Sequence, residues 1–235
     1  QKTWKQRYRA WCNWPSQLHR DPEIHTLNTE DLSGPSVHVR FVTPDARFVI
    51  NGSWNLHGIS EHNDTRVSKL DPPELVATFD HPMNLFRNPV VTPDERFMVS
   101  TDDSMIDSIN LWNLETATLV RKMNGHTLPI HSLTVTPDGR FIVSGASDKT
   151  VKVWELATGD LKHTLEGHRE KVYAVAVTPN GRFIVSGALD GTMRVWDLAT
   201  GDLKRTLEGH YGIVYAVAVT PDGRFIVSGA SDKTV

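Results

Sequence analysis

Short apolar runs alternate with turn residues along the second half of the chain. Residues 172–177 (VYAVAV) form a continuous apolar run, which is typical of a strand buried on both faces. Pro179-Asn180-Gly181 predicts a tight turn after it, because proline fixes φ and glycine closes the turn. Asp190-Gly191 predicts a second turn, and a more polar run follows the third strand. The pattern predicts four antiparallel strands, over residues 172–177, 182–187, 192–196 and 203–207.

The four-strand pattern is repeated along the chain. Residues 137–178 and 179–220 agree at 32 of 42 positions without a gap, and residues 221–235 repeat residues 137–151 without a change. Two more divergent copies precede them. The Thr-Pro-Asp turn (Thr-Pro-Asn in one copy) begins at residues 43, 92, 136, 178 and 220, in steps of 49, 44, 42 and 42. These steps indicate about four and a half units.

Residue pairs at fixed places in each unit resemble those of the WD-repeat family. The pairs are Gly-His at 125–126, 167–168 and 209–210, Trp-Glu at 154–155 and Trp-Asp at 196–197. The similarity weakens upstream, where Asp80-His81 and Trp112-Asn113 replace them. The resemblance implies an all-β fold, a partial WD-repeat β-propeller of about 4.5 four-stranded blades over residues 34–235. Since such rings usually need about seven blades, we expect an open arc with an exposed edge at Thr234-Val235.

The resemblance also implies a hydrogen-bonded set of His, Ser, Asp and Trp in each blade. A Ser/His/Asp trio occurs in hydrolases too, but a catalytic triad is present once, with an oxyanion hole beside it. A trio that recurs in every blade satisfies buried polar groups, so we expect a structural role and no enzyme activity. The sets are His126, Ser144, Asp148 and Trp154; His168, Ser186, Asp190 and Trp196; and His210, Ser228 and Asp232.

The differences between the two closest copies concentrate in two loops. Ser147-Asp148-Lys149 is replaced by Leu189-Asp190-Gly191 between the second and third strands. Arg169-Glu170-Lys171 is replaced by Tyr211-Gly212-Ile213 after Gly-His. Antiparallel connections alternate between the ends of a sheet, so both loops are predicted at the same end. A constant frame with one varied end is typical of a binding surface on a rigid support. The WD-repeat resemblance implies a partner surface at this same end.

We therefore expect this end to bind other proteins or peptides. Leu189, Tyr211 and Ile213 are predicted to be exposed apolar anchors of the kind that dominate interfaces. Tyr173 and Tyr215, near the start of the first strands, either join this surface or pack in the core. The predicted partner-binding residues are Ser147, Lys149, Arg169, Glu170, Lys171, Tyr173, Leu189, Tyr211, Ile213, Tyr215 and Ser231.

Composition narrows the remaining classes of function. Hydrophobic residues make up 39% and charged residues 23% of the chain, and the net charge is −3. Residues 1–20 carry five basic residues and no acidic one, but the acidic remainder argues against a nucleic-acid partner. The single cysteine, Cys12, favours a reducing compartment, the cytoplasm or alternatively the nucleus. No apolar run is long enough for a membrane span, and we expect no cofactor and no metal site.

Residues 1–33 do not fit the repeat and are predicted to form a helical segment. Trp4, Tyr8 and Trp11 fall at i, i+4 and i+7, on one face of a short helix that Pro15 ends. The same string resembles the end of an F-box domain. Besides a general interaction scaffold, this resemblance implies an alternative: the substrate-recognition part of a ubiquitin ligase, bound to a Skp-type adaptor through residues that precede Gln1.

Overall fold

The structure is a computed structural model that describes residues 37–42, 48–53, 65–70, 73–79, 89–101 and 108–234. The chain divides into two units, Gln1–Ser33 and Gly34–Val235, and all the described strands belong to the second. The helix predicted around Trp4 and Trp11 lies outside the described residues. All the secondary-structure elements within the described ranges are β-strands, which confirms the all-β class.

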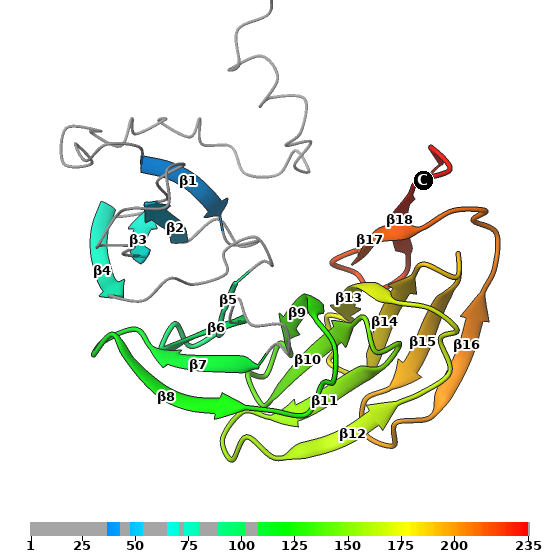
Figure 1. The fold of residues 1–235 in the computed structure, drawn as a ribbon, viewed down its shortest axis with the longest axis horizontal. Helices are drawn as coiled ribbons and strands as arrows, with labels where there is room; N and C mark the ends of the chain where they lie inside the picture. The colour runs from blue at the N-terminus through cyan, green and yellow to red at the C-terminus, as the bar shows by residue number, and fades with distance from the viewer. Residues whose placement is uncertain are drawn as a thin grey trace, which may run out of the picture. The chain divides into compact units, whose positions relative to one another are not determined.

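The strands form antiparallel sheets in which strand order follows chain order (Figure 1). Among the described residues, four sheets have four strands and the last has two, as the repeat predicts. The first two sheets contain β1 (Val37–Val42), β2 (Phe48–Ser53), β3 (Thr65–Leu70) and β4 (Pro73–Phe79), then β5 (Val90–Val91), β6 (Phe97–Thr101), β7 (Ile109–Asn113) and β8 (Thr118–Met123). The others contain β9 (Ile130–Val135), β10 (Phe141–Ala146), β11 (Val151–Glu155) and β12 (Leu161–Leu165), then β13 (Val172–Val177), β14 (Phe183–Ala188), β15 (Met193–Asp197) and β16 (Leu203–Leu207), and finally β17 (Val214–Val219) and β18 (Ile226–Ala230).

A repeated turn joins the first two strands of a sheet. Before β10, Thr136 Oγ1 donates to Asp138 Oδ1 at 2.6 Å, and Phe141 N donates to Thr136 Oγ1 at 2.9 Å. Gly139 N donates to the Thr136 carbonyl at 2.8 Å and has φ of +70°, a conformation that favours glycine. The same bonds recur in the next two sheets. The Thr-Pro-Asp/Asn-Gly sequence thus sets this turn through local bonds.

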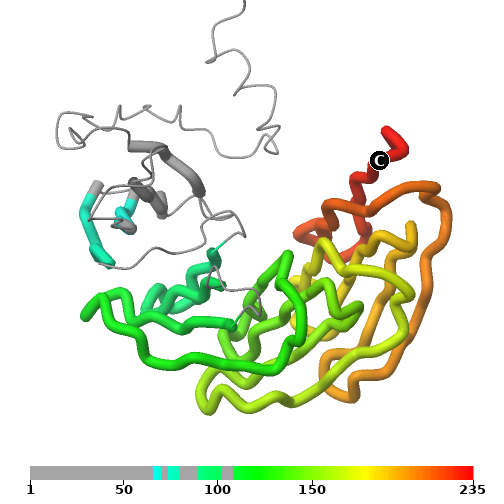
Figure 2. Tube along the Cα trace, viewed as in Figure 1, coloured from blue at the N-terminus to red at the C-terminus, as the bar shows by residue number. Residues whose placement is uncertain are grey.

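The hydrophobic core lies between successive sheets. The first strands of successive sheets lie side by side, β9 beside β13 and β13 beside β17, although about one repeat separates them in the sequence (Figure 2). One buried cluster joins Phe141 and Val151 of sheet β9–β12 to Val172 and Ile184 of sheet β13–β16. Glycine is required at position 145, because a Cβ there would lie 2.7 Å from Val172 Cγ1. Fourth strands β12 and β16 are mostly exposed, as their polar sequences predict.

Candidate partner-binding end

A network of His, Ser, Asp and Trp side chains joins the loop before β9 to strands β10 and β11. His126 Nδ1 donates to Asp148 Oδ2 at 2.8 Å, and Ser144 Oγ donates to His126 Nε2 at 2.8 Å. Trp154 Nε1 donates to the same Ser144 oxygen at 2.9 Å. The indole N–H can only donate and the carboxylate can only accept, so one neutral tautomer of the histidine satisfies every bond. The network therefore holds the loop in place without an unpaired buried group.

The next sheet repeats this network. His168 lies 3.1 Å from Asp190 and 2.7 Å from Ser186 Oγ, which also accepts from Trp196 Nε1 at 2.9 Å. Burial lowers the pKa of His168, although Asp190 opposes that change. Burial opposes ionisation of Asp190, but hydrogen bonds from Thr192 and from backbone N–H groups outweigh it and lower the pKa of this carboxyl. Asp190 therefore binds His168, and His168 and Trp196 bind the Ser186 hydroxyl, which is fully buried and so suits a framework rather than a nucleophile.

The third network anchors the loop that carries Tyr211, the most exposed aromatic residue in the described part of the chain. His210 Nδ1 donates to Asp232 Oδ2 at 2.9 Å, and Ser228 Oγ lies 2.8 Å from His210 Nε2. Asp232 also accepts from Tyr211 N at 2.9 Å and from Thr234 Oγ1 at 2.7 Å. The Thr234 bond and backbone N–H bonds hold the pKa of Asp232 well below its usual range. The backbone of Tyr211 is thus fixed, while its side chain is 99% exposed.

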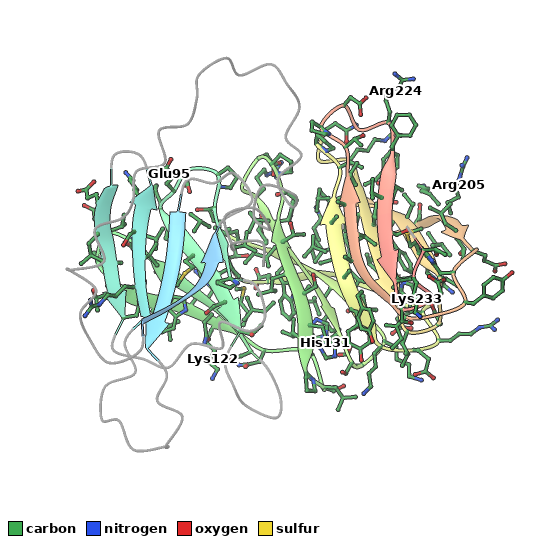
Figure 3. All side chains as sticks on the ribbon, turned by 90° about the horizontal axis from the view of Figure 1, so that it is seen from above. Glu95, Lys122, His131, Arg205, Arg224 and Lys233 are labelled. Carbon is green, nitrogen blue, oxygen red and sulfur yellow. The ribbon has the colours of Figure 1, made fainter. Side chains whose placement is uncertain are left out.

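The two varied loops lie together at what we call the Gly-His end: the loops after each Gly-His pair and the turns between second and third strands. Leu189 N, in such a turn, donates to the carbonyl of Lys171, in the Gly-His loop of the same sheet, at 2.8 Å. Figure 3 shows His131 and Lys233 toward this end and Arg224 toward the opposite one. The varied residues therefore share one surface region, held by backbone bonds between the loops.

The predicted partner-binding side chains differ in exposure. Tyr211 and Tyr215 are 99% and 54% exposed. The other exposed members are Lys149, Arg169, Glu170, Lys171 and Ser231. Tyr173, Leu189 and Ile213 are half-buried. Two of the three expected apolar anchors are therefore partly covered by their surroundings, and Tyr211 is the one that projects fully.

Ser147 does not lie on the surface as expected. Its side chain is only 7% exposed, and its Oγ lies 2.6 Å from Nε2 of His131, the second residue of β9 in the same sheet. This hydrogen bond holds the short hydroxyl inward, and partner binding by Ser147 stays a prediction. Ser231, at the corresponding place two sheets later, is exposed, and its Oγ accepts from Ile213 N at 2.8 Å.

His131 belongs to the Gly-His end although nothing in its immediate sequence singles it out. Its ring stacks on Tyr173, with centroids 4.6 Å apart and planes at 27°. Tyr173 in turn makes an edge contact with Tyr215, with centroids 5.6 Å apart. The signal that could have identified His131 is the repeat itself, since positions 131, 173 and 215 are equivalent in three successive units.

Metal-ligand groups and membrane-spanning helices were the other two features sought in the described part of the chain. Its residues include no group of three His, Cys, Asp or Glu side chains placed to hold a metal ion. Over the same residues, no helix has the length and apolar character needed to cross a membrane.

Comparisons with known proteins agree with this geometry. Residues 117–155, 159–197 and 201–235 match the WD40 family, described as WD domain, G-beta repeat. A stretch of 55 residues is 36% identical to a protein of Dictyostelium discoideum named anaphase-promoting complex subunit cdh1. That match covers 23% of the chain and spans only 7% of the length of this relative. The WD-repeat resemblance is confirmed for residues 117–155, 159–197 and 201–235, whereas the F-box resemblance of residues 1–33 stays a prediction.

Proposed function

We propose that this chain is a protein-interaction scaffold that binds its partners at the Gly-His end, as the match of residues 117–155, 159–197 and 201–235 to WD40 repeats suggests. The observation that carries the proposal is the contrast between a repeated framework and varied loops at one end. The His-Ser bonds measure 2.8, 2.7 and 2.8 Å in three successive sheets. The loops that these bonds support differ at all three positions after Gly-His. Binding residues are commonly placed on loops that a rigid scaffold positions.

Tyr211 is the strongest single anchor at this end. Its side chain is almost wholly exposed, yet the Asp232 carboxylate fixes its backbone N–H. An ordered, exposed tyrosine offers a large contact area at little cost in conformational entropy, and tyrosine and arginine are enriched among the residues that dominate interfaces. Arg169 occupies the equivalent place in the preceding Gly-His loop and is also exposed.

The test compares variants at the two ends of the same sheets. Tyr211→Ala combined with Arg169→Ala should weaken binding of a purified partner by about tenfold or more. Leu203→Ala is the matched control, because Leu203 is 43% exposed and lies at the start of β16, away from the Gly-His end. A partner whose affinity falls with the control variant and not with the double variant would contradict the proposal.

The alternative function is recruitment of substrates within a larger assembly such as a ubiquitin ligase. It is favoured by the spacing of Trp4, Tyr8 and Trp11 and by the relative whose name makes it a subunit of a complex. Co-purification of the full reading frame with a Skp-type adaptor would support the F-box form of this alternative. The adaptor should be lost when everything that precedes the repeats is removed from that reading frame. Failure of the adaptor to bind would remove that form and leave the scaffold function intact.

A further inference from the structure

The sequence contains three Asn-Gly pairs, and they lie in different local structures. Asn124-Gly125 follows β8, Asn180-Gly181 forms the turn between β13 and β14, and Asn51-Gly52 lies inside β2, which pairs with a strand on each side. In an Asn-Gly pair the main chain attacks the side-chain amide more readily than in other dipeptides, because glycine has no Cβ to obstruct the approach and rotates freely. The structure therefore places the same reactive pair in several settings.

The reaction converts the asparagine amide into a carboxylate. Solvent hydroxide removes the proton of the glycine N–H, and the glycine nitrogen then bonds to asparagine Cγ. The Cγ–N bond of the side-chain amide breaks, and its nitrogen takes up a proton and leaves as ammonia. Water opens the resulting cyclic imide at one of its two carbonyls, which gives either aspartate or isoaspartate. Water is the only co-reactant, so the structural requirements are a free glycine N–H and a free asparagine side chain.

At Asn180 the turn engages both reacting groups. Gly181 N donates to the Thr178 carbonyl at 2.8 Å. Asn180 Oδ1 accepts from Thr178 Oγ1 at 2.7 Å and from Arg182 N at 3.0 Å. These three bonds have to break before the nitrogen can reach Cγ, and each broken bond adds to the barrier. The turn therefore protects Asn180 from the reaction.

Asn124 and Gly125 are not restrained in this way. Both residues are exposed and lie between the end of β8 and His126, outside the strands. Over the described residues, no hydrogen bond engages Gly125 N or the Asn124 side-chain amide. The attacking nitrogen, the amide and solvent water are therefore all available at this pair.

From this contrast we propose that Asn124-Gly125 is a site of spontaneous deamidation and isoaspartate formation. The aspartate product keeps the length of the main chain and places a carboxylate where Glu166 and Glu208 stand in the next two units. That product is therefore compatible with the repeat. The inference does not depend on the proposed function, because it concerns the chemistry of this segment and not the binding of a partner.

The isoaspartate product does not fit between the fixed ends of the segment. Met123 is 4% exposed within the core, and His126 is 3% exposed and bound by two side chains of its network. Isoaspartate routes the main chain through its Cβ and Cγ, so it adds one atom between these two anchors. Gly125 cannot take up that atom by moving toward Trp154, because even a Cβ at this glycine would lie 2.7 Å from the indole. Isoaspartate therefore displaces His126 and weakens its network.

The test is incubation of the full chain in mildly alkaline buffer at physiological temperature, followed by tryptic peptide mapping with mass spectrometry. The two asparagines fall in separate tryptic peptides, residues 123–140 and 172–182. We expect Asn124 to convert at least about tenfold faster than Asn180, since three hydrogen bonds restrain only the latter pair. In urea, where the turn is lost, the two rates should become similar.

Three variants separate the effect of local structure from that of sequence. Thr178→Ala removes the hydroxyl that binds Asn180 Oδ1, so it should speed up conversion of Asn180 and leave that of Asn124 unchanged. Asn124→Gln should block the reaction at position 124, since the longer side chain would have to close a larger ring. The incubated native chain should melt at a lower temperature than fresh protein, whereas incubated Asn124→Gln should melt as it does when fresh. Fresh Asn124→Asp should melt like the native chain, because it does not lengthen the main chain.

Similar rates for the two asparagines in the folded chain, or faster conversion of Asn180, would overturn the assignment of the site. An Asn124 that stays intact in the folded chain but converts in urea would overturn it as well. Isoaspartate at position 124 with an unchanged melting temperature would overturn the inferred effect on the His126 network. These outcomes are distinguishable from failure of the proposed function, which is tested by partner affinity and by Tyr211 and Arg169.

Discussion

The junction between sheets β9–β12 and β13–β16 differs from the next junction along the chain, although both join nearly identical sheets. At the first, Lys149 Nζ donates to the Arg169 carbonyl at 2.8 Å and lies 3.6 Å from Glu170. At the second, Gly191 takes the place of the lysine, and a Cβ there would lie 2.8 Å from the His210 carbonyl oxygen. A long basic side chain bridges one junction, and the backbone itself closes the other.

At both junctions the varied residues of the Gly-His loop fit the varied residues of the turns that face this loop. Gly212 faces Ser231 so closely that a Cβ at position 212 would collide with the serine hydroxyl, whose Oγ accepts from Ile213 N at 2.8 Å. The first junction has Glu170 where the second has Gly212, and its Lys149 reaches across to it. The loop after Gly-His therefore has to fit both the turn of the preceding sheet and the turn of its own sheet, while the networks beneath them keep their geometry.

The largest expected effect comes from breaking the constant framework. Trp196 is 2% exposed, packs in the core between two sheets and donates to Ser186 Oγ. Trp196→Ala should lower the free energy of unfolding by about 3–5 kcal/mol, since it leaves a cavity and removes one of the two hydrogen bonds of the Ser186 hydroxyl. Guanidinium unfolding followed by circular dichroism measures the loss. A change smaller than about 1 kcal/mol would mean that the sheets do not depend on this network.

Gly191→Lys tests whether the varied junctions can be exchanged singly. The substitution places a side chain at φ of +75° and pushes its Cβ toward the His210 carbonyl, so the free energy of unfolding should fall by about 1–3 kcal/mol. The same unfolding measurement applies. Adding Tyr211→Arg, Gly212→Glu and Ile213→Lys together with Ser231→Leu, which matches Leu189 of the preceding sheet, rebuilds the first junction without the collision at Ser231 and should restore most of the loss. No restoration would show that the two loops do not form a matched set.

Acidification should weaken the framework rather than the varied loops. Burial lowers the pKa of His168, so its contribution is fully present above about pH 6.5 and declines as the pH falls below that value. Lowered pKa values of Asp148 and Asp190 add stability above about pH 4 that is lost at more acidic pH. Unfolding measured at pH 8, 5.5 and 3.5 should show a stepwise decline. In Asp190→Asn the acidic step should shrink, and an unchanged profile would contradict this assignment.

The smallest expected effect is that of Lys149→Ala. Lys149 and Glu170 are both about half exposed, and surface ion pairs contribute less than about 1 kcal/mol. We expect unfolding in 0.15 M and 1 M salt to differ from that of the native chain by less than this amount. A loss as large as that of Trp196→Ala would place the varied junction within the framework and remove the distinction between the two.

Local signals were sufficient for much of the fold. The Thr-Pro-Asp/Asn-Gly turn closes through bonds between residues at most five apart, so its sequence predicts it directly. The apolar run of β13 and the polar run of β16 predict an inner and an outer strand, because side-chain burial follows apolar content. The WD-repeat resemblance implied the network of His126, Ser144, Asp148 and Trp154, and the equal spacing of the next set extended it, because a repeat places equivalent residues in equivalent surroundings.

The sequence by itself therefore determined the strands, their turns, their grouping and the residues of each network, since these depend on local bonds and on a strict repeat. Only the tertiary structure decided that the Ser147 side chain points inward to His131 and that Ile213 and Leu189 are half-buried. It also decided that the rings of His131, Tyr173 and Tyr215 lie in contact. These features depend on how closely one sheet approaches the next and on one-residue shifts of register. The sequence of a single strand predicts neither the approach of two sheets nor a shift of register, because both depend on contacts between residues about one repeat apart.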